Sequence, residues 1–231
     1  MTVLAFQLKS WIMALVLVVL PLQAVWAAAS EKEMLREYVR DNTLTLVDRL
    51  DDIRTLYGED REGFYTKMDE ALGEFVAFRR VAARVMGRYA RQTTREERDE
   101  FVHAFRRSLY DAYGGAAASV SSSDFELRVE EVAINPRDSD RATANLKIIT
   151  HEGDRYGIAY SMYRSDDDRW LVENIIVEGV NIGLAFRDHF NQQIRKYDGD
   201  VQKVISNWSV EDEDLRGIEN TLRDEGNADA E

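Results

Sequence analysis

The pattern of apolar and polar positions divides the chain into a helical first part and a sheet-forming second part. Apolar residues recur every three or four positions between residues 30 and 113, which is typical of amphipathic helices. They alternate with polar residues between residues 125 and 176, which is typical of strands with one buried face. After Gly179 the helical period returns. The pattern therefore predicts an α+β fold.

Interruptions in the apolar pattern separate the helices that precede the sheet. We expect these helices at residues 30–56, 64–76, 78–89 and 94–113. Thr94 and Glu97 have the spacing of a capping box, in which a hydroxyl and a carboxylate bind the free N–H groups of a first helical turn. Gly114 and Gly115 indicate the end of that helix or a kink in it.

The second part of the chain predicts four strands, at residues 125–129, 142–148, 156–162 and 170–176. Their connections are short and turn-like, and strands joined in this way are antiparallel, because a parallel pair needs a crossover of a dozen or more residues. Helices are expected at residues 182–194 and 201–208. The expected architecture is a four-stranded curved antiparallel sheet packed against several helices and enclosing an apolar cavity.

The two ends of the chain differ in composition from the part between them. Residues 1–29 contain Lys9, an apolar run of about twelve residues and the small residues Ala27 to Ala29, which together predict a secretory signal peptide cleaved near Ala27–Ala29. Residues 209–231 contain nine acids and two arginines, and we expect an acidic tail without fixed structure. The remaining residues, 30–208, form a single expected domain.

Charge and cysteine content exclude several classes of function. The chain of 231 residues has a formal net charge of −13 and contains no cysteine. Nucleic-acid binding depends on Lys and Arg to displace phosphate counterions, so an acidic chain disfavours it. Disulfides, thiolate catalysis and cysteine-ligated zinc are impossible.

Catalytic and metal-binding motifs are missing from the sequence. His103, His151 and His189 lie far apart and have no metal-ligand spacing, so we interpret them as surface or hydrogen-bonded core residues. The run Asp166 to Asp168 lies in a predicted turn and lacks the bidentate glutamate of a calcium loop. We therefore expect no enzyme activity, no metal and no cofactor.

Large apolar side chains are numerous on both the predicted helices and the predicted sheet. One interpretation is an ordinary core. The other is an apolar cavity between a curved sheet and the helices, of the kind that binds small apolar ligands. Periodicity alone leaves both open.

Arginines recur along the predicted third helix at intervals of three or four residues, at Arg80, Arg84, Arg88, Arg91 and Arg95. They would share one face if the helix continued that far. This basic stripe is either a solvated face whose arginines pair with neighbouring acids, or a docking surface for an acidic partner or a phosphate headgroup.

Three segments resemble the MlaC-type family of periplasmic phospholipid-binding proteins, which includes toluene-tolerance proteins. They are residues 75–89, residues 94–113, and residues 170–181 leading into the Phe186–Phe190 segment, and they occur in the family's order. Four positions depart from the family pattern, where Asp, Trp, Asp and Ser are usual; here they are Ala77, Ala90, Asn174 and Asn181.

The resemblance implies a soluble periplasmic carrier that moves phospholipid between an outer-membrane lipoprotein complex and an inner-membrane ABC transporter, and so maintains outer-membrane lipid asymmetry. The phospholipid would be cargo rather than cofactor. If the basic stripe is a docking surface, Arg80, Arg84, Arg88 and Arg91 would contact the partners. Val180 and Ile182 would lie at the mouth of the lipid pocket. Periodicity and the family's cavity together predict its lining: Phe75, Phe78, Val85, Met86, Phe101, Phe105, Leu109, Tyr113, Leu146, Ile148, Tyr160, Met162, Ile176, Val180 and Ile182.

Two other classes of function remain open from the sequence. A binding module of the same shape could hold a fatty acid, a hopanoid or an aromatic solute. A structural adaptor would have a filled core and use the basic stripe only for docking.

Overall fold

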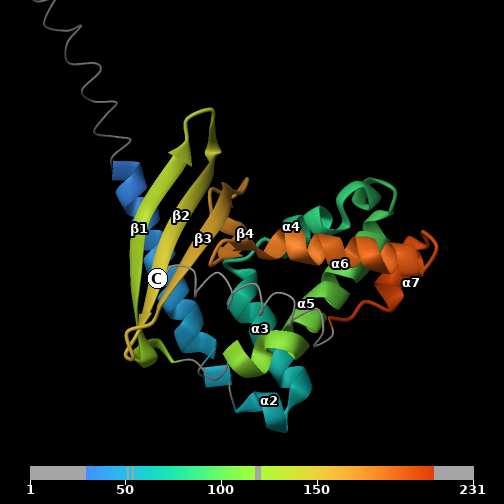
Figure 1. Ribbon diagram of the computed structural model, residues 1–231, viewed down its shortest axis with the longest axis horizontal. Helices are drawn as coiled ribbons and strands as arrows, with labels where there is room; N and C mark the ends of the chain where they lie inside the picture. Colours follow the sequence, from blue (N-terminus) through green and yellow to red (C-terminus); the bar gives the residue numbers. More distant parts are fainter. Residues whose placement is uncertain (1–29, 51, 54, 118–120, 211–231) are drawn as a thin grey trace, which may run out of the picture.

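In the computed structural model, an open antiparallel sheet lies beside a group of helices (Figure 1). The structure describes residues 30–50, 52–53, 55–117 and 121–210, so the predicted signal peptide and nearly all of the predicted acidic tail lie outside the described residues. After an N-terminal helix (residues 30–50 and 52–53), the elements are α2 (Leu56–Glu59), α3 (Arg61–Gly73), α4 (Phe78–Met86), η1 (Gly87–Arg91), α5 (Arg95–Ala117), η2 (Ser122–Asp124), β1 (Phe125–Asn135), β2 (Asp138–Thr150), β3 (Arg155–Arg164), β4 (Trp170–Val177), β5 (Val180–Asn181), α6 (Ile182–Lys196) and α7 (Val201–Ser206).

The predicted antiparallel meander is confirmed, with one strand more than expected. The five strands follow one another in the order β1-β2-β3-β4-β5. Glu178 and Gly179 both have positive φ, 47° and 79°, as the central residues of a tight hairpin turn require. This turn brings Val180 back to pair with Val177. The extra strand β5 is only two residues long, so its alternation is too short to recognise in the sequence.

An irregularity in β4 changes which of its side chains face the core. Met162 pairs with Val172, but the adjacent Ser161 pairs with Asn174, which leaves Glu173 without a partner residue on β3. Such a bulge reverses the facing of every residue beyond it. The alternation from Val172 to Ile176 that the sequence predicts is therefore wrong: Ile175, not Ile176, shares the face of Val172.

Two apolar clusters form the core. The sheet cluster joins the N-terminal helix and Phe75 to one face of the sheet, and the helical cluster joins α3, α4, α5, α6 and α7. Leu35 and Val39 of the N-terminal helix are buried in the sheet cluster, whereas Ile53 near its other end is buried in the helical cluster. The predicted first helix thus connects the two clusters.

Aromatic rings fill the helical cluster. The ring of Phe101 lies 5.2 Å from that of Phe190 and 5.0 Å from that of Trp208, both edge-on. Phe105 contacts Phe186 at 5.3 Å in the same geometry. The indole N–H of Trp208 donates to the Ser108 hydroxyl at 2.9 Å, which satisfies its hydrogen bond inside the core.

The second predicted helix ends earlier than the apolar pattern suggests. It stops at Gly73, and after a turn Val76 forms a parallel bridge with Val172 of β4. Val172 N–H donates to Phe75 O at 2.8 Å, and Ala77 N–H donates to Val172 O at 2.9 Å. Phe75 is therefore part of the sheet cluster, because this backbone pairing competes successfully with a further helical turn.

The predicted capping box at the start of α5 is confirmed. Thr94 Oγ1 accepts from Glu97 N–H at 3.1 Å, and the Glu97 carboxylate accepts from Thr94 N–H at 2.7 Å. Of the two alternatives predicted at Gly114 and Gly115, an end of the helix or a kink, the end is wrong, because the helix continues to Ala117. Gly114 serves packing instead: a Cβ there would lie 2.6 Å from the ring of Phe64 on α3.

Replacing Gly114 by Ala should therefore destabilise the fold, even though alanine favours helices. The added methyl would overpack against Phe64, and we expect a loss of about 1–3 kcal/mol in the free energy of unfolding. Urea denaturation measures it. Gly58→Ala is the matched control, because nothing lies within 4 Å of a Cβ at Gly58; equal losses in both variants would contradict the packing role of Gly114.

Candidate functional site

A strip of apolar side chains crosses one face of the sheet. Residues directly opposite each other in antiparallel strands share a face, and the pairs here join Ile148 to Tyr156, Ile158 to Val177, and Val177 to Val180. Tyr156 is 45% exposed, and the other four are half-buried. We call these five residues the apolar strip.

The apolar strip continues the face that carries the sheet cluster. Elsewhere on this face Ala144, Tyr160 and Met162 are buried in that cluster, beneath Phe75 and the N-terminal helix. Ile158 packs against the cluster, whereas the other four strip residues belong to neither apolar cluster of the described residues. Partly exposed apolar side chains that lie side by side are typical of a binding surface.

The predicted pocket residues on the sheet divide between the core and the apolar strip. Leu146, Tyr160 and Met162 are buried in the sheet cluster, and burial raises the pKa of the Tyr160 hydroxyl. Ile148 belongs to the apolar strip. Ile176 is half-buried on the opposite face, because the bulge at Glu173 reverses the alternation.

The remaining predicted lining residues lie in several places. Val180 belongs to the apolar strip, and Phe75 contacts the ring of Tyr160 at 5.8 Å in the sheet cluster. Tyr113 lies on α5, but its side chain is outside the described residues. The others contribute to the helical cluster, either buried within it or packed against it: Phe78, Val85, Met86, Phe101, Phe105, Leu109 and Ile182. The predicted lining thus combines residues of the sheet cluster, the helical cluster and the apolar strip.

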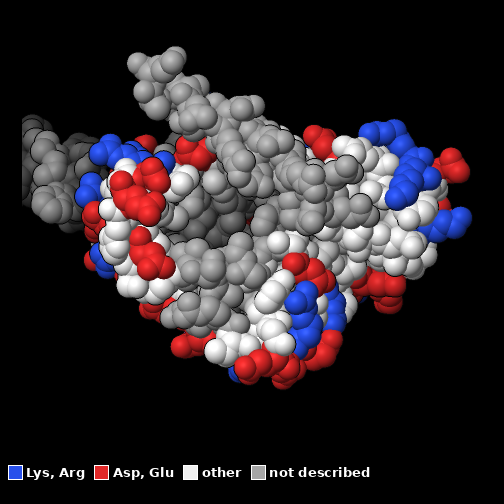
Figure 2. Space-filling view, turned by 60° about the horizontal axis from the view of Figure 1, so that its bottom comes forward, with Lys and Arg blue, Asp and Glu red and all other residues white. Residues whose placement is uncertain are grey.

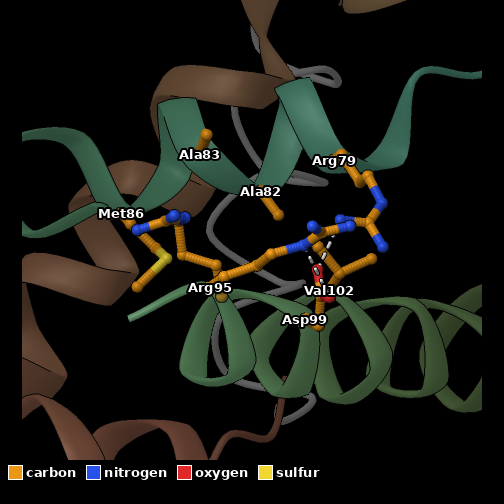
Figure 3. A pocket seen from close by; sticks show the side chains of 8 residues that line it. Arg79, Ala82, Ala83, Met86, Arg95, Asp99 and Val102 are labelled. Atoms are coloured by element: carbon orange, nitrogen blue, oxygen red, sulfur yellow. Dashed lines mark hydrogen bonds and ion pairs between the residues drawn. The ribbon is translucent and has the colours of Figure 1, made fainter. Parts of the chain in front are cut away.

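A small pocket lies between α4 and α5 (Figure 3). Its volume is about 290 Å³, and Ala82, Met86 and Val102 give it an apolar wall. Arg79 and Asp99 form an ion pair of 2.5 Å at one side. This pocket is at the lower end of the usual size of ligand sites.

The predicted basic stripe does not lie on one helix. Helix α4 ends at Met86, where Gly87 has a φ of 57°, a conformation that glycine adopts at low cost. Arg80 and Arg84 are on α4, whereas Arg88 and Arg91 lie in the η1 turn. The single helical face was expected only if the helix continued that far, and this condition is not met because α4 ends before Gly87.

Arg80 and Arg84 bind a buried carboxylate that the sequence analysis did not identify. Glu173 is 4% exposed, and its carboxylate accepts from Arg80 Nε at 3.0 Å and from an Arg84 guanidinium nitrogen at 2.6 Å. Arg141 of β2 also donates to it. The guanidinium of Arg80 stacks on the ring of Tyr163 at 3.9 Å. This cluster joins α4 to two strands of the sheet.

The covering of the outer sheet face by α4 explains why Glu173 was missed. Strict alternation places Glu173 on the solvent side, next to the inward Val172. In the structure the carboxylate is buried among three arginines, as a buried charge requires. The sequence pattern identified the arginines of the stripe, but periodicity did not show which carboxylate they bind.

Two of the positions that depart from the family pattern hold the start of α6. Asn181 Oδ1 accepts from Leu184 N–H at 3.1 Å, and Asn174 Oδ1 accepts from Gly183 N–H at 3.1 Å. Asp and Ser oxygens accept the same kind of hydrogen bond, so these substitutions keep the helix cap.

The histidines and the aspartate run have the following places. His189 is buried, with Nε2 2.9 Å from Ser209 O, while His103 and His151 are exposed. Asp166 to Asp168 form an exposed turn between β3 and β4. Within the described ranges, no group of three or more carboxylate or histidine side chains is arranged to hold a metal ion.

The described part of the chain also has no helix with the length and apolar character to span a membrane.

Comparisons with known proteins agree on one family. The family model described as MlaC protein matches residues 40–210. The toluene tolerance protein ttg2D of Pseudomonas putida is 28% identical over 179 residues, which cover 76% of this chain and 80% of that protein.

A solved structure shares the fold. It is the phospholipid-binding protein from Ralstonia solanacearum, determined in complex with a phospholipid, and it superposes with a TM-score of 0.62 at 18% identity. The similarity covers 85% of this chain and 98% of that one. At this level of identity the comparison establishes the α+β fold.

The Glu173 cluster predicts a measurable electrostatic contribution to stability. Glu173→Gln keeps the shape but removes the negative charge that Arg80, Arg84 and Arg141 share, and we expect a loss of about 2 kcal/mol in the free energy of unfolding. The arginine side chains are 33–48% exposed and can regain water, which keeps the loss below that of a fully buried pair. Glu126→Gln, at an exposed ion pair with Arg128, is the control. An unchanged urea midpoint in Glu173→Gln would contradict this contribution.

Proposed function

Because the chain belongs to the MlaC family, we propose that it is a soluble carrier of phospholipid that binds acyl chains on the apolar strip. Two observations support the proposal. The family model covers residues 40–210, and a protein of the same fold was solved with a phospholipid bound. This chain's own structure adds a third, the apolar strip, which continues the buried face of the sheet. Only Ile158 of the strip packs against an apolar cluster of the described residues.

The energetics of a lipid in water explain why a carrier needs such a surface. Two acyl chains of about 16 carbons contain roughly 30 methylenes, and transferring these to water costs about 0.8 kcal/mol each, or on the order of 24 kcal/mol in all. A carrier must therefore cover most of the chains. The headgroup can remain hydrated, so the site needs few polar side chains.

Charge and the absence of catalytic motifs fit this function. A chain with a net charge of −13 is repelled by anionic leaflets, which would help a carrier to leave a membrane after exchange. We propose that the protein is not an enzyme. The predicted signal peptide supports a periplasmic location, where the carrier would exchange lipid with an outer-membrane lipoprotein complex and an inner-membrane ABC transporter and so maintain outer-membrane lipid asymmetry.

A charge placed on the apolar strip tests the proposal. Val180→Glu would set a carboxylate against the acyl chains, and burying an unpaired charge costs far more than the few methylene contacts at this position return. We expect the purified variant to lose its bound lipid, measured as lipid phosphorus per mole of protein after organic extraction.

Met34→Glu is the matched control, because it introduces the same charge at an apolar side chain that is 59% exposed on the N-terminal helix. It should retain the lipid of the natural protein. Circular dichroism verifies that both variants fold. Lipid retention at the natural level in folded Val180→Glu would remove Val180 from the binding site.

A further inference from the structure

A pocket lined by three arginines lies between the η1 turn and α6. Its volume is about 660 Å³, which is within the usual range of ligand sites. Arg88 comes from η1, and Arg187 and Arg195 come from α6. A spacing of eight residues places the last two on one helical face, two turns apart. We call this hollow the arginine pocket.

The arginine pocket holds guanidinium groups without carboxylate partners. Many other arginines are neutralised: Arg106 lies 2.5 Å from Asp69, and Arg164 lies 2.5 Å from Glu31. In the ranges that the structure describes, Arg88, Arg187 and Arg195 form no ion pair.

Local contacts hold two of these arginines at the pocket. Arg88 hydrogen-bonds to the Tyr89 hydroxyl at 3.1 Å. The Arg187 side chain lies over Gly87, with its Nε 3.4 Å from where a Cβ would be. Asp188 also lines the hollow but is not paired with the arginines among the described residues. The pocket therefore concentrates positive charge on an acidic protein.

Figure 2 shows Lys and Arg side chains gathered at the right-hand end of the face it displays, the end at which α6 and α7 lie in Figure 1. Met86 and Ile194 also line the pocket, but they are 1% and 6% exposed, so its accessible surface comes mainly from the polar side chains. Asn191 and Gln192 add amide donors and acceptors at the wall. Three guanidinium groups and two amides along one hollow match a peptide with several carboxylates better than a single small anion.

We propose that the arginine pocket is the docking site for a carboxylate-rich segment of a protein partner. Asp or Glu side chains of this segment bind the three guanidinium groups, which fit carboxylates as planar forks. A protein is favoured over a membrane surface because the net charge of −13 repels anionic lipid.

This inference deepens the proposed function by giving the carrier a place to dock, and its test separates docking from lipid binding. The probe is a fluorescein-labelled peptide of glutamates around one central leucine, with a glutamine version as control. Anisotropy titrations compare the natural protein with the double variant Arg187→Gln and Arg195→Gln. We expect binding of the glutamate peptide alone, weakened at least about tenfold in the double variant because two charge-assisted contacts are lost.

The matched control is the double variant Arg137→Gln and Arg155→Gln, which removes the same charge from two exposed arginines, one in the turn between β1 and β2 and one at the start of β3. It should bind as the natural protein does. No binding to the natural protein, or equal binding to both double variants, would overturn the proposal. Displacement of the peptide by inorganic phosphate at constant ionic strength would overturn it in favour of a small-anion site.

Two further measurements keep the proposals distinct. If phosphatidylglycerol vesicles bind the natural protein and not the Arg187/Arg195 double variant, the pocket contacts membranes and the docking proposal fails. Lipid phosphorus in this double variant should equal that of the natural protein, and its loss would also overturn the proposal. Natural protein that binds the peptide but contains no lipid would instead contradict the carrier function alone.

Discussion

The junction between Val172 and the segment before α4 holds the two halves of this structure together. Val172 exchanges backbone hydrogen bonds with Phe75 and Ala77, and the next residue, Glu173, binds arginines of α4 and β2. The first set of contacts brings Phe75 into the sheet cluster. The contacts of Glu173 hold α4 against β4. Together the two sets of contacts fix where α4 lies relative to the sheet.

This junction also determines which part of the sheet is covered. Phe75 and the N-terminal helix bury Tyr160 and Met162, while beyond the bulge the same face carries the apolar strip up to Val180. The bulge is needed for this continuous face, because it brings Ile175 and Val177, instead of Ile176, onto the face of the core. Glu173, the extra residue at the bulge, points to the opposite face of the sheet, where it binds the arginines.

Much of the fold was predictable from the sequence, because strong local signals agreed with the final packing. The change of period gave the α+β class and the antiparallel meander, and Thr94 and Glu97 gave the start of α5. The failures occurred where tertiary contacts outweighed local pattern. Phe75 and Val76 continue a helical pattern but pair with a strand, and Gly114 resembles a helix terminator but makes room for Phe64.

The site was less predictable than the fold, for a related reason. Periodicity identifies apolar faces, but it does not tell a filled core from an open surface, so Phe101 and Phe105 were grouped with Ile148 and Val180. The unpaired arginines were equally hidden, because Arg187 and Arg195 lie a hundred residues from Arg88 and meet it only in the fold.

Native mass spectrometry of the chain from residue 30 onwards, purified without detergent, tests the carrier function most directly. The account predicts a complex heavier than the protein by one phospholipid, whose identity follows from fragmentation of the released ligand. Recovery of the folded protein without any lipid, or with a fatty acid, a hopanoid or an aromatic solute in its place, would contradict it.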